Sequence, residues 1–415
     1  MTVFALTLWV WQQTESATTL ALISFFAQVP RLVITLFAGV IVDRFYRKSL
    51  MILGDSSAAF CTAAIGLLYF IGQLQVWHLY CAVAIHGCFG QIQQLAYTAS
   101  IALLVPKQYY TRAGGMGAAV TFSSAILAPA LAGGLYPAIG LGGIIAVDML
   151  TFTAGLGTLL AVRIPQPDSI DSNSAELDSI WQTLTFGFRY IGKHPSLMAM
   201  VIAFSLFAFP SDMERVLYSP LILARTEGSA QILGVVNAAG GVGGVLGAIL
   251  MSVWGGFPRR IHGMLLGFAG AGFFRLLFGL GRTLFVWIPT QFFATLHTPI
   301  FFSSSNAIWY AKVPPNLQGR VLAADQLVGI VVSLTATLTA GLLADRVFEP
   351  MMQSNTILAN RLGAIVGTQA GSGIALLFIL TAIWMLLVGI AGYWVPVLRE
   401  VEKTLPDHDG VSAPD

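Results

Sequence analysis

The chain has 415 residues, of which 56% are hydrophobic and only 10% are charged, with a mean hydropathy of +0.78 and a net charge of +2. A water-soluble domain carries about 25% charged residues, so this composition excludes a soluble protein and indicates a polytopic membrane protein. The cysteines Cys61, Cys81 and Cys88 stand in apolar runs, which favours core packing over a disulfide framework or a metal cluster.

The chain begins with an apolar stretch, Met1 to Trp11, that is followed at once by the polar residues 12–15. A helix needs about 20 residues to cross a bilayer. The stretch also lacks a basic leader and a small-residue cleavage site, so it does not have the features of a signal peptide. We therefore expect the outer half of a first spanning helix, with the start codon misassigned or the chain truncated.

Further apolar runs of spanning length follow along the chain. Five of them precede a polar segment at 163–195, and six come after it. The predicted spans are 18–42, 50–72, 77–104, 112–138, 140–162, 196–223, 229–253, 262–281, 285–311, 319–344 and 370–396. The sequence thus predicts an all-α membrane protein with twelve transmembrane helices, the first of them incomplete.

Lysine and arginine are distributed unevenly between the two sides of this predicted topology. One side holds fourteen of them: Arg44, Arg47, Lys48, Lys107, Arg112, Arg163, Arg189, Lys193, Arg259, Arg260, Lys312, Arg320, Arg399 and Lys403. The other side holds only four: Arg225, Arg282, Arg346 and Arg361. Because basic loops stay in the cytoplasm, the first side is predicted to be cytoplasmic. Both termini of the full-length protein would lie on that side.

The polar segment contains apolar residues at three- and four-residue intervals: Leu177, Ile180, Trp181, Leu184, Phe188 and Ile191. Acids precede this run and bases end it, which suits the dipole of one helix. We expect an amphipathic helix on the cytoplasmic membrane surface. A solvated tether is the alternative.

An internal repeat predicts two related halves. Val105-Pro106 and Val313-Pro314 stand 208 residues apart, and so do the segments 132–135 and 340–343. Parallel repeats about an axis along the membrane normal are found in some transporters. The predicted organisation is therefore a bundle at 1–162, a linker at 163–195, a second bundle at 196–398 and a cytoplasmic tail at 399–415.

A short charged loop between the second and third spans carries the clearest motif. Gly39, Asp43, Arg44, Arg47 and Lys48 match the G-x-x-x-D-R-x-x-R-K loop of the major facilitator superfamily in type and spacing. The resemblance implies two pseudo-symmetric six-helix bundles. It also implies a gating latch in which Asp43 meets the start of the eleventh helix near Arg320. A basic loop that only fixes the topology is the alternative.

The fifth span resembles the glycine-and-proline signature of antiporters in the same superfamily. Gly115, Pro129 and Gly133 match it by identity, whereas Ser124, Ala128 and Ala132 are small residues in glycine positions. Small residues permit close helix contact, and proline bends the helix. Ordinary helix packing explains the pattern as well.

The seventh span contains Asp212, Glu214 and Arg215. An ionisable residue in a span costs about 2.5–3.5 kcal/mol on insertion scales. Asp212 and Arg215 are three residues apart and can pair on one face. If a proton is carried, Asp212 is our first choice for the coupling carboxylate; a static buried salt bridge is the alternative.

Other polar residues also fall inside the predicted spans. Six of them are predicted to line a substrate cavity: Arg31, His86, Gln91, Gln94, Gln291 and Asn306. Asp55, Asp148, Arg275 and His297 complete the set. Hydrogen bonds between helices are the alternative role for all of these residues.

Motifs for an enzyme are missing from the sequence. We find no G-x-x-x-x-G-K-[ST], H-E-x-x-H or G-x-S-x-G pattern. We therefore expect no catalytic residues, no cofactor, no metal site and no binding of nucleic acid.

Three longer segments, 8–18, 313–321 and 341–350, resemble the proton-linked macrolide and siderophore exporters of the superfamily. This resemblance implies export of an amphipathic small molecule from a bacterial cytoplasm, driven by inward proton flow across the inner membrane. We expect the protein to act as a monomer whose partners are substrate, protons and lipid. A facilitator or importer of the same fold, or a transporter-like receptor without turnover, remains an alternative.

Overall fold

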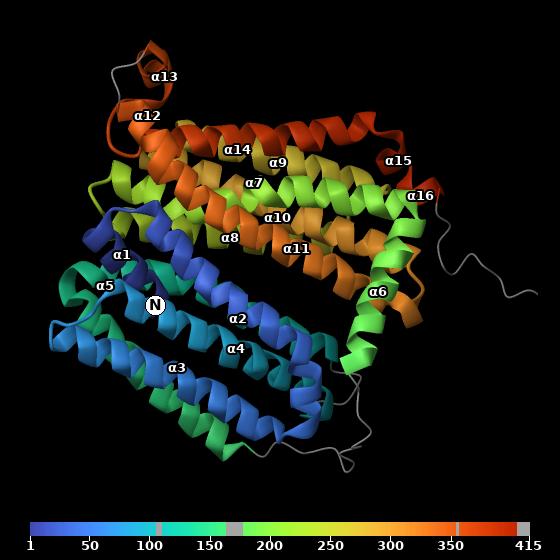
Figure 1. Cartoon of the computed structure of the whole chain (residues 1–415), viewed down its shortest axis with the longest axis horizontal. Helices are drawn as coiled ribbons and strands as arrows, with labels where there is room; N and C mark the ends of the chain where they lie inside the picture. Colours follow the sequence, from blue (N-terminus) through green and yellow to red (C-terminus); the bar gives the residue numbers. More distant parts are fainter. Residues whose placement is uncertain (105–109, 163–176, 354–356, 405–415) are drawn as a thin grey trace, which may run out of the picture. The chain divides into compact units, whose positions relative to one another are not determined.

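The computed structural model describes residues 1–104, 110–162, 177–353 and 357–404. Within them, side chains are not described at 35–44, 98–99, 101–104, 110–122, 125, 177–184, 315–316, 319, 357–360 and 365. The described chain is almost wholly helical and contains no strand (Figure 1). It divides into two compact units.

The first unit comprises Met1–Glu176 together with Gly228–Gly234. Its helices are α1 (Thr2–Thr14), α2 (Ala17–Arg44), α3 (Arg47–Phe70), α4 (Val76–Leu104) and α5 (Tyr110–Ala161). Helix α4 packs between α2 and α3, and α5 packs against α1 and α3 (Figure 1). A side chain in place of Gly87 on α4 would collide with the backbone carbonyl of Ala27 on α2, so glycine sets this close approach.

Helix α5 consists of two helices that meet at Gly140. The backbone there has φ 62° and ψ −170°, a conformation that is open essentially only to glycine. The sequence predicted one span to end at 138 and the next to begin at 140. The position of this break is therefore confirmed.

The second unit comprises Leu177–Glu227 and Val235–Asp415. Its long helices are α6 (Leu177–Lys193), α7 (Pro195–Arg225), α8 (Ala230–Trp254), α9 (Arg260–Leu280), α10 (Leu284–Lys312), α11 (Pro315–Leu343) and α14 (Ser372–Ala391). Helix α9 packs against α10 and α14, and α7 packs against α11 and α14. These helices end within a few residues of the predicted boundaries.

Helix α8 approaches α10 along three glycines. A side chain at Gly243 or Gly247 would collide with a backbone carbonyl of α10. At Gly240 the carbonyl oxygen accepts a hydrogen bond from the Thr295 hydroxyl at 2.8 Å. Small residues at this spacing bring two backbones together, where dispersion forces and interhelical hydrogen bonds stabilise the pair.

Aromatic rings fill one part of the core of the second unit. Phe207 on α7 stacks on Phe268 on α9, with ring centroids 3.9 Å apart, and Phe301 on α10 meets both rings edge-on. Phe207 and Phe268 are almost fully buried. Each such aromatic pair contributes about 0.5–1.5 kcal/mol beyond the burial of its area.

The structure extends the predicted eleventh span, which we placed at 319–344. After α11 the chain continues through a π-helical turn, Ala344–Phe348, into α12 (Glu349–Gln353). A further helix, α13 (Ile357–Val366), precedes α14 and was not predicted. The Glu349 carboxylate then accepts hydrogen bonds from the backbone N–H groups of Gly371, Gly373 and Ile374 at 2.7–3.2 Å, which caps the N-terminus of α14.

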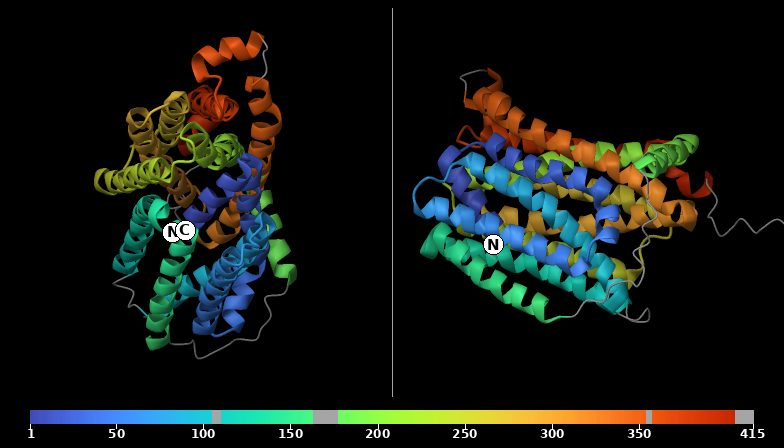
Figure 2. Two further views of the ribbon diagram at one scale, coloured as in Figure 1. Left: turned by 90° about the vertical axis from the view of Figure 1, so that its left-hand side faces the viewer. Right: turned by 60° about the horizontal axis from the view of Figure 1, so that its bottom comes forward.

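The helix that we predicted in the polar segment 163–195 is present as α6. It packs against α11 (Figure 2, right). A Cβ atom at Gly187 would lie 2.8 Å from the Cβ of Ala324. Ile191 is buried, whereas Phe188 on another side of the helix is exposed. Part of the apolar face of α6 is therefore covered by its own unit.

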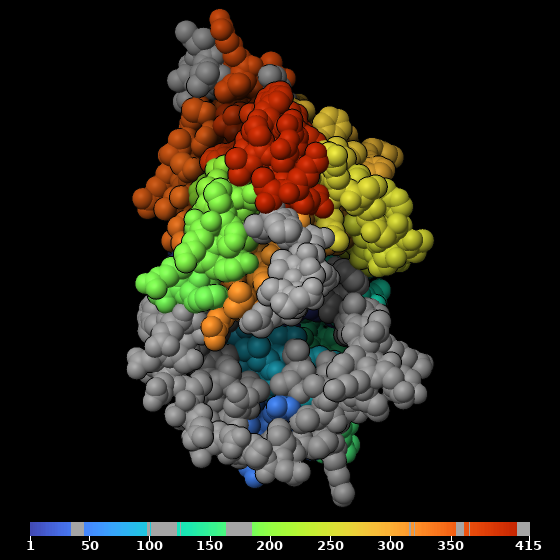
Figure 3. Space-filling model, turned by 90° about the vertical axis from the view of Figure 1, so that its right-hand side faces the viewer, coloured from blue at the N-terminus to red at the C-terminus, as the bar shows by residue number. Residues whose placement is uncertain are grey.

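Three short helices end the described chain: a 3₁₀ turn (Gly392–Trp394), α15 (Pro396–Arg399) and α16 (Val401–Thr404). These helices belong to the red region of Figure 3, and α15 and α16 pack against α7. Ser196 shares a hydrogen bond with Thr404 at 3.1 Å. The buried ammonium group of Lys312 donates to the backbone carbonyl of Glu402 at 2.7 Å. The C-terminal helices thus contact both the start of α7 and the end of α10.

Eight described segments are long and apolar enough to cross a membrane. Helices α4 and α10, with 29 residues each, also have the length to span. The segment of α5 that meets the test contains both sides of the break at Gly140. This pattern is consistent with the predicted plan of twelve spans and confirms a multi-pass, all-α membrane protein.

Candidate functional site

Two helices of the second unit each carry two prolines. Pro210 and Pro220 lie inside α7, and Pro289 and Pro299 lie inside α10. Proline removes one backbone hydrogen bond and clashes with the preceding turn, which kinks a transmembrane helix or leaves it locally adaptable. Both helices run on without a break, and on each of them the two prolines lie on either side of one residue of the network described next, Glu214 on α7 and Gln291 on α10.

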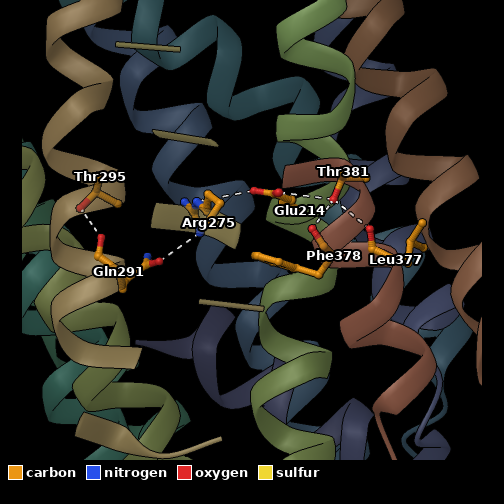
Figure 4. Close-up of polar contacts among 7 residues, drawn as sticks. All are labelled: Glu214, Arg275, Gln291, Thr295, Leu377, Phe378 and Thr381. Atoms are coloured by element: carbon orange, nitrogen blue, oxygen red, sulfur yellow. Dashed lines mark hydrogen bonds and ion pairs between the residues drawn. The ribbon is translucent and has the colours of Figure 1, made fainter. Parts of the chain in front are cut away.

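Glu214 on α7 is the centre of a buried polar network (Figure 4). Its side chain is only 1% exposed. One carboxylate oxygen, Oε1, accepts a hydrogen bond from the Thr381 hydroxyl on α14 at 3.3 Å. The other, Oε2, lies 3.6 Å from Nε of Arg275 on α9. The carboxylate therefore faces a cation on one side and a hydroxyl on the other.

Arg275 extends the network to α10 (Figure 4). Its Nη1 donates to the side-chain carbonyl Oε1 of Gln291 at 3.0 Å. Gln291 is buried, and its backbone carbonyl accepts a hydrogen bond from the Thr295 hydroxyl at 2.9 Å. One guanidinium group thus joins an acid on α7 to an amide on α10. The network links α7, α9, α10 and α14.

Two buried oxygens near this network have no hydrogen-bond partner among the described residues. They are Oε2 of Glu214 and the hydroxyl of Tyr218, one helical turn further along α7. At 3.6 Å, the approach of Arg275 to Oε2 is an ion pair without a hydrogen bond. A buried acceptor in this state carries a desolvation cost. Oε2 is therefore a buried carboxylate oxygen that accepts no hydrogen bond from the described residues and has the Arg275 guanidinium nearby.

Asp212 and Arg215 form the ion pair that the sequence predicted. Nη2 of Arg215 lies 2.9 Å from Oδ1 of Asp212, and it also donates to the Ser333 hydroxyl on α11 at 3.1 Å. The two side chains are 22% (Asp212) and 56% (Arg215) exposed within the unit. Asp212, our first choice from the sequence, is therefore the less buried of the two acids. Glu214 has the buried environment that we had attributed to Asp212.

In the first unit, Nε of Arg31 on α2 donates to Oε1 of Gln91 on α4 at 2.7 Å. His86 and Gln94, on the same helix as Gln91, are exposed within the unit. Four of the predicted cavity residues thus lie on two neighbouring helices. Their contact with a substrate stays a prediction.

Asn306 on α10 lines a different part of the second unit. It borders a cavity of about 520 Å³ between the end of α8 and α10. Arg260 and Ser304 also line this cavity, and Nη1 of Arg260 donates to the backbone carbonyl of Ala307 at 3.0 Å. Asn306 therefore does not belong to the Glu214 network, which includes Gln291.

The latch residues are only partly described. The side chains of Gly39, Asp43 and Arg44 lie outside the described residues. The ammonium group of Lys48 donates to the backbone carbonyls of Leu160 and Val162 at 2.9 and 2.7 Å, at the C-terminal end of α5. A cation at this position satisfies carbonyls that have no helical partner.

The two remaining cations of the predicted latch are described. Arg47 begins α3, where its side chain is partly buried. The guanidinium carbon of Arg320 lies 5.5 Å from the centroid of the Phe186 ring on α6, within the second unit. A cation over an aromatic ring is attracted to it. Neither position tests the latch, which stays a prediction.

The antiporter-like residues of α5 lie at a close helix contact. A Cβ atom at Gly133 would be 3.0 Å from the Cα of Gly234, at the start of α8. A Cβ atom at Gly234 would be 2.8 Å from the carbonyl oxygen of Pro129. These two residues therefore permit close packing, while Gly115 lies outside the residues whose side chains are described.

Sequence reasoning missed three polar residues inside the predicted spans. Thr381 and Tyr218 belong to strongly apolar segments and carry no charge that would single them out. Asp325 on α11 is a partly buried carboxylate within a predicted span, and its charge was a signal that the sequence did offer. Arg275 was recognised as an intramembrane cation, but its partner on α7 was not.

The chain matches the family model of the Major Facilitator Superfamily over residues 1–337 and belongs to that family. It is therefore a membrane transporter and not an enzyme. It is similar to Macrolide efflux protein A of Streptococcus pyogenes, with 25% identity over 81% of this chain and 83% of that protein. It is also similar to Multidrug efflux pump Tap of Mycolicibacterium fortuitum, with 22% identity over 97% of this chain and 93% of that protein.

Solved structures show the same fold. A bacterial homologue of the human lysosomal transporter Spinster, in an inward-facing, unoccupied conformation, has a TM-score of 0.70 and 16% identity. The alignment covers 100% of this chain and 95% of that one. A bacterial homologue of the iron transporter ferroportin has a TM-score of 0.65 and 13% identity, over 94% of this chain and 90% of that one.

Proposed function

We propose that this transporter exports an amphipathic small molecule of the macrolide class in exchange for protons, by alternating access. The similarity to macrolide and multidrug efflux proteins supports the direction and the substrate class. The observation that carries proton coupling is the buried carboxylate of Glu214, whose Oε2 accepts no hydrogen bond and forms an ion pair with Arg275. A carboxylate at such a site is the kind of group that proton-driven transporters use.

The coupling step follows from the charges in the network. While Glu214 is ionised, it offsets the charge of Arg275 and connects α7 to α9. A proton on Oε2 would neutralise the acid and leave the cation with Gln291 as its partner. Because an unpaired charge in a low-dielectric region is costly, protonation would favour a different arrangement of these helices. The prolines of α7 and α10 are positioned to permit that rearrangement.

Asp212 and Arg215 have a secondary role in this proposal. Their pair is exposed within the unit and tied to α11 through Ser333. It would orient α7 against α11 while Glu214 binds the proton. Arg31, His86, Gln91 and Gln94 of the first unit, with Gln291 and Asn306 of the second, remain the proposed substrate-contacting residues.

The organisation of the protein is part of the same proposal. The bundles would span 1–162 and 196–398, with the linker 163–195 and the tail 399–415 on the cytoplasmic side of a bacterial inner membrane. Asp43 with Gly39, Arg44, Arg47, Lys48 and Arg320 would form the inner latch, and Gly115, Pro129 and Gly133 would support the antiporter-type packing of α5. The transporting species would be a monomer.

The test is proton release driven by substrate. The chain is placed in inside-out vesicles whose interior is first acidified. A macrolide is then added, and the internal pH is followed by dye fluorescence. We expect macrolide-dependent proton release that Glu214→Gln abolishes and Asp212→Asn only slows. Glu227→Gln is a matched control, because Glu227 lies in the turn between α7 and α8.

Each rival predicts a different result. Release that persists in Glu214→Gln would remove Glu214 from the coupling step while leaving antiport in place. Macrolide flux without proton release would indicate a facilitator. Binding of radiolabelled macrolide without flux or proton release would indicate a receptor and would overturn export.

A further inference from the structure

The cavity that Asn306 borders lies where α8 ends and α9 begins, beside α10. It has a volume of about 520 Å³. Its lining includes the apolar side chains of Met251, Phe257 and Phe302 and the polar side chains of Arg260 and Ser304. None of the lining residues is acidic. The cavity therefore offers apolar surface and a positive charge together.

Two glycines form the wall between α8 and α9. Helix α8 ends at Trp254, and Gly255 and Gly256 follow with φ +80° and +89°. Glycine adopts such a backbone readily, whereas other residues are strained there. Both glycines line the cavity, and a Cβ atom at Gly256 would lie 3.2 Å from Cε of Met251. The turn therefore leaves space where side chains would otherwise stand.

Arg260 is held at this cavity by a neutral acceptor. Its Nη1 donates to the backbone carbonyl of Ala307 at 3.0 Å, and it forms no ion pair with an acid in the described part of the chain. The carboxylate of Glu402 accepts a hydrogen bond from the N–H group of Ile261 at 3.1 Å and does not line the cavity. The remaining N–H groups of the Arg260 guanidinium are therefore available to a ligand.

Ser304 adds a hydroxyl to the same wall. It is only 3% exposed, and its side chain makes no hydrogen bond with the residues that the structure describes. A side chain at Gly263, on the first turn of α9, would collide with Oγ of Ser304, so glycine leaves room for the hydroxyl. Ser304 and Ala307 are three residues apart and share one side of α10. A ligand oxygen near Arg260 would thus also satisfy a buried hydroxyl, which is costly to leave without a partner.

The cavity lies at the depth of lipid headgroups. Helix α8 is long and apolar enough to span the membrane and ends at Trp254, and the next such helix, α9, begins at Arg260. Residues 255–259 are therefore the turn between two spans at one membrane surface. Trp254 is 52% exposed, and its ring meets Phe257 edge-on with centroids 4.7 Å apart. Tryptophan is enriched at the boundary between lipid and water.

From this geometry we propose that the cavity binds the phosphate headgroup of an anionic lipid. Arg260 presents a fork of donors that matches phosphate oxygens, and the Ser304 hydroxyl donates to the same group. The apolar lining then contacts the glycerol and the first part of the acyl chains. Free phosphate has the same charged chemistry, but it would leave most of a 520 Å³ cavity and its apolar surface uncovered. Asn306, a proposed substrate contact, has no part in this site, which does not depend on the direction or the substrate of transport.

The experiment uses the full chain, stripped of lipid in a neutral detergent, and three probes. The probes are a short-chain phosphatidylglycerol, the diacylglycerol with the same acyl chains, and inorganic phosphate. The Kd of each probe is measured from the shift in melting temperature, and native mass spectrometry counts the bound lipid. The test variants are Arg260→Gln and Ser304→Ala. The second variant removes a hydroxyl that makes no hydrogen bond within the described chain, so it tests the site without removing a structural contact.

Arg259→Gln is the matched control. Arg259 is the exposed neighbour of Arg260, lies outside the lining and makes no side-chain cap for α9. We expect Arg260→Gln to weaken phosphatidylglycerol binding about tenfold, the loss of roughly one charge-assisted hydrogen bond, and Ser304→Ala to weaken it about threefold. Arg259→Gln, which loses the same charge, should leave binding unchanged.

The probes and variants separate the possible results. Unchanged phosphatidylglycerol binding in Arg260→Gln, or an equal loss in Arg259→Gln, overturns the proposal. Diacylglycerol that binds as tightly as phosphatidylglycerol would exclude recognition of the phosphate, and inorganic phosphate that binds as tightly would assign a site for a small anion. Either result overturns the assignment to a lipid headgroup. If Arg260→Gln does not fold, unchanged binding in Ser304→Ala overturns the proposal.

Discussion

The two ion pairs that involve acids of α7 differ in burial and in the helices that they connect, and their distances do not reveal this difference. The Asp212–Arg215 pair is the shorter, at 2.9 Å, but it joins two residues of one helix, and the arginine is 56% exposed. The Glu214–Arg275 pair is longer, at 3.6 Å, but it joins two helices, and its acid is 1% exposed. An exposed pair contributes about 0–1 kcal/mol, whereas breaking a buried pair costs about 3–5 kcal/mol. Burial and connectivity, more than distance, identify the pair that can couple a proton to helix movement.

The largest effect on stability is expected for Arg275→Gln. This change leaves the Glu214 carboxylate buried with only the Thr381 hydroxyl as a partner. We expect a loss of about 3–5 kcal/mol in the free energy of unfolding, measured in mixed micelles of detergent and SDS. If the acid becomes protonated instead, the loss will be smaller at low pH than at high pH. A loss below about 1 kcal/mol at every pH would mean that the pair is not tightly coupled.

Removal of the acid should cost less than removal of the base. In Glu214→Gln the cation keeps Gln291 and is itself 20% exposed. We expect a loss of about 1–3 kcal/mol, together with the loss of substrate-driven proton release. The double variant Glu214→Gln/Arg275→Gln should be more stable than the sum of the single losses predicts, because neither charge is then left alone. Strictly additive losses would contradict a direct interaction.

Asp212→Asn is the matching change in the exposed pair. Its neutral amide can still accept a hydrogen bond from Arg215, and that arginine also keeps Ser333. We expect a loss of no more than about 1 kcal/mol in the same unfolding assay and retention of proton release at a reduced rate. Raised ionic strength should narrow the difference from the native chain, since salt screens exposed charges. A loss equal to that of Glu214→Gln would remove the distinction between the two pairs.

The sequence predicted the features that hydropathy and charge determine locally. Hydropathy placed the spans, the charges of α7 stood out as costly, and the predicted boundary between the spans 112–138 and 140–162 coincides with the break at Gly140. The sequence favoured Asp212, which can pair with Arg215, but it could not show which acid is buried, because two residues two positions apart on a helix point to different sides. Only the packing of α9 and α14 shows which side is buried. The turn at Ala344–Phe348 and helix α13 were missed, since a π-helical turn leaves no strong signature in composition.

The cavity with Arg260 and Ser304 was hidden from the sequence for a related reason. Charge counting placed Arg259 and Arg260 on one predicted side of the membrane, but it could not show that Arg260 lines the cavity whereas Arg259 does not. Ser304 carries no charge and stands inside the predicted span 285–311. The convergence of these residues depends on how α8 and α10 pack, which no periodicity in the sequence specifies.

The smallest effect is expected for Tyr218→Phe. The Tyr218 ring stacks on Phe278 with centroids 5.4 Å apart, and its buried hydroxyl has no hydrogen-bond partner among the described residues. Phenylalanine keeps the stacking and removes a desolvated polar group, so stability should change by less than about 0.5 kcal/mol or rise slightly. If the hydroxyl passes protons to Oε2 of Glu214, one turn away, the rate of proton release will nevertheless fall. A change in rate without a change in stability would thus extend the coupling site along α7. If neither changes, Tyr218 contributes only its ring, and Glu214 alone on α7 carries the proton.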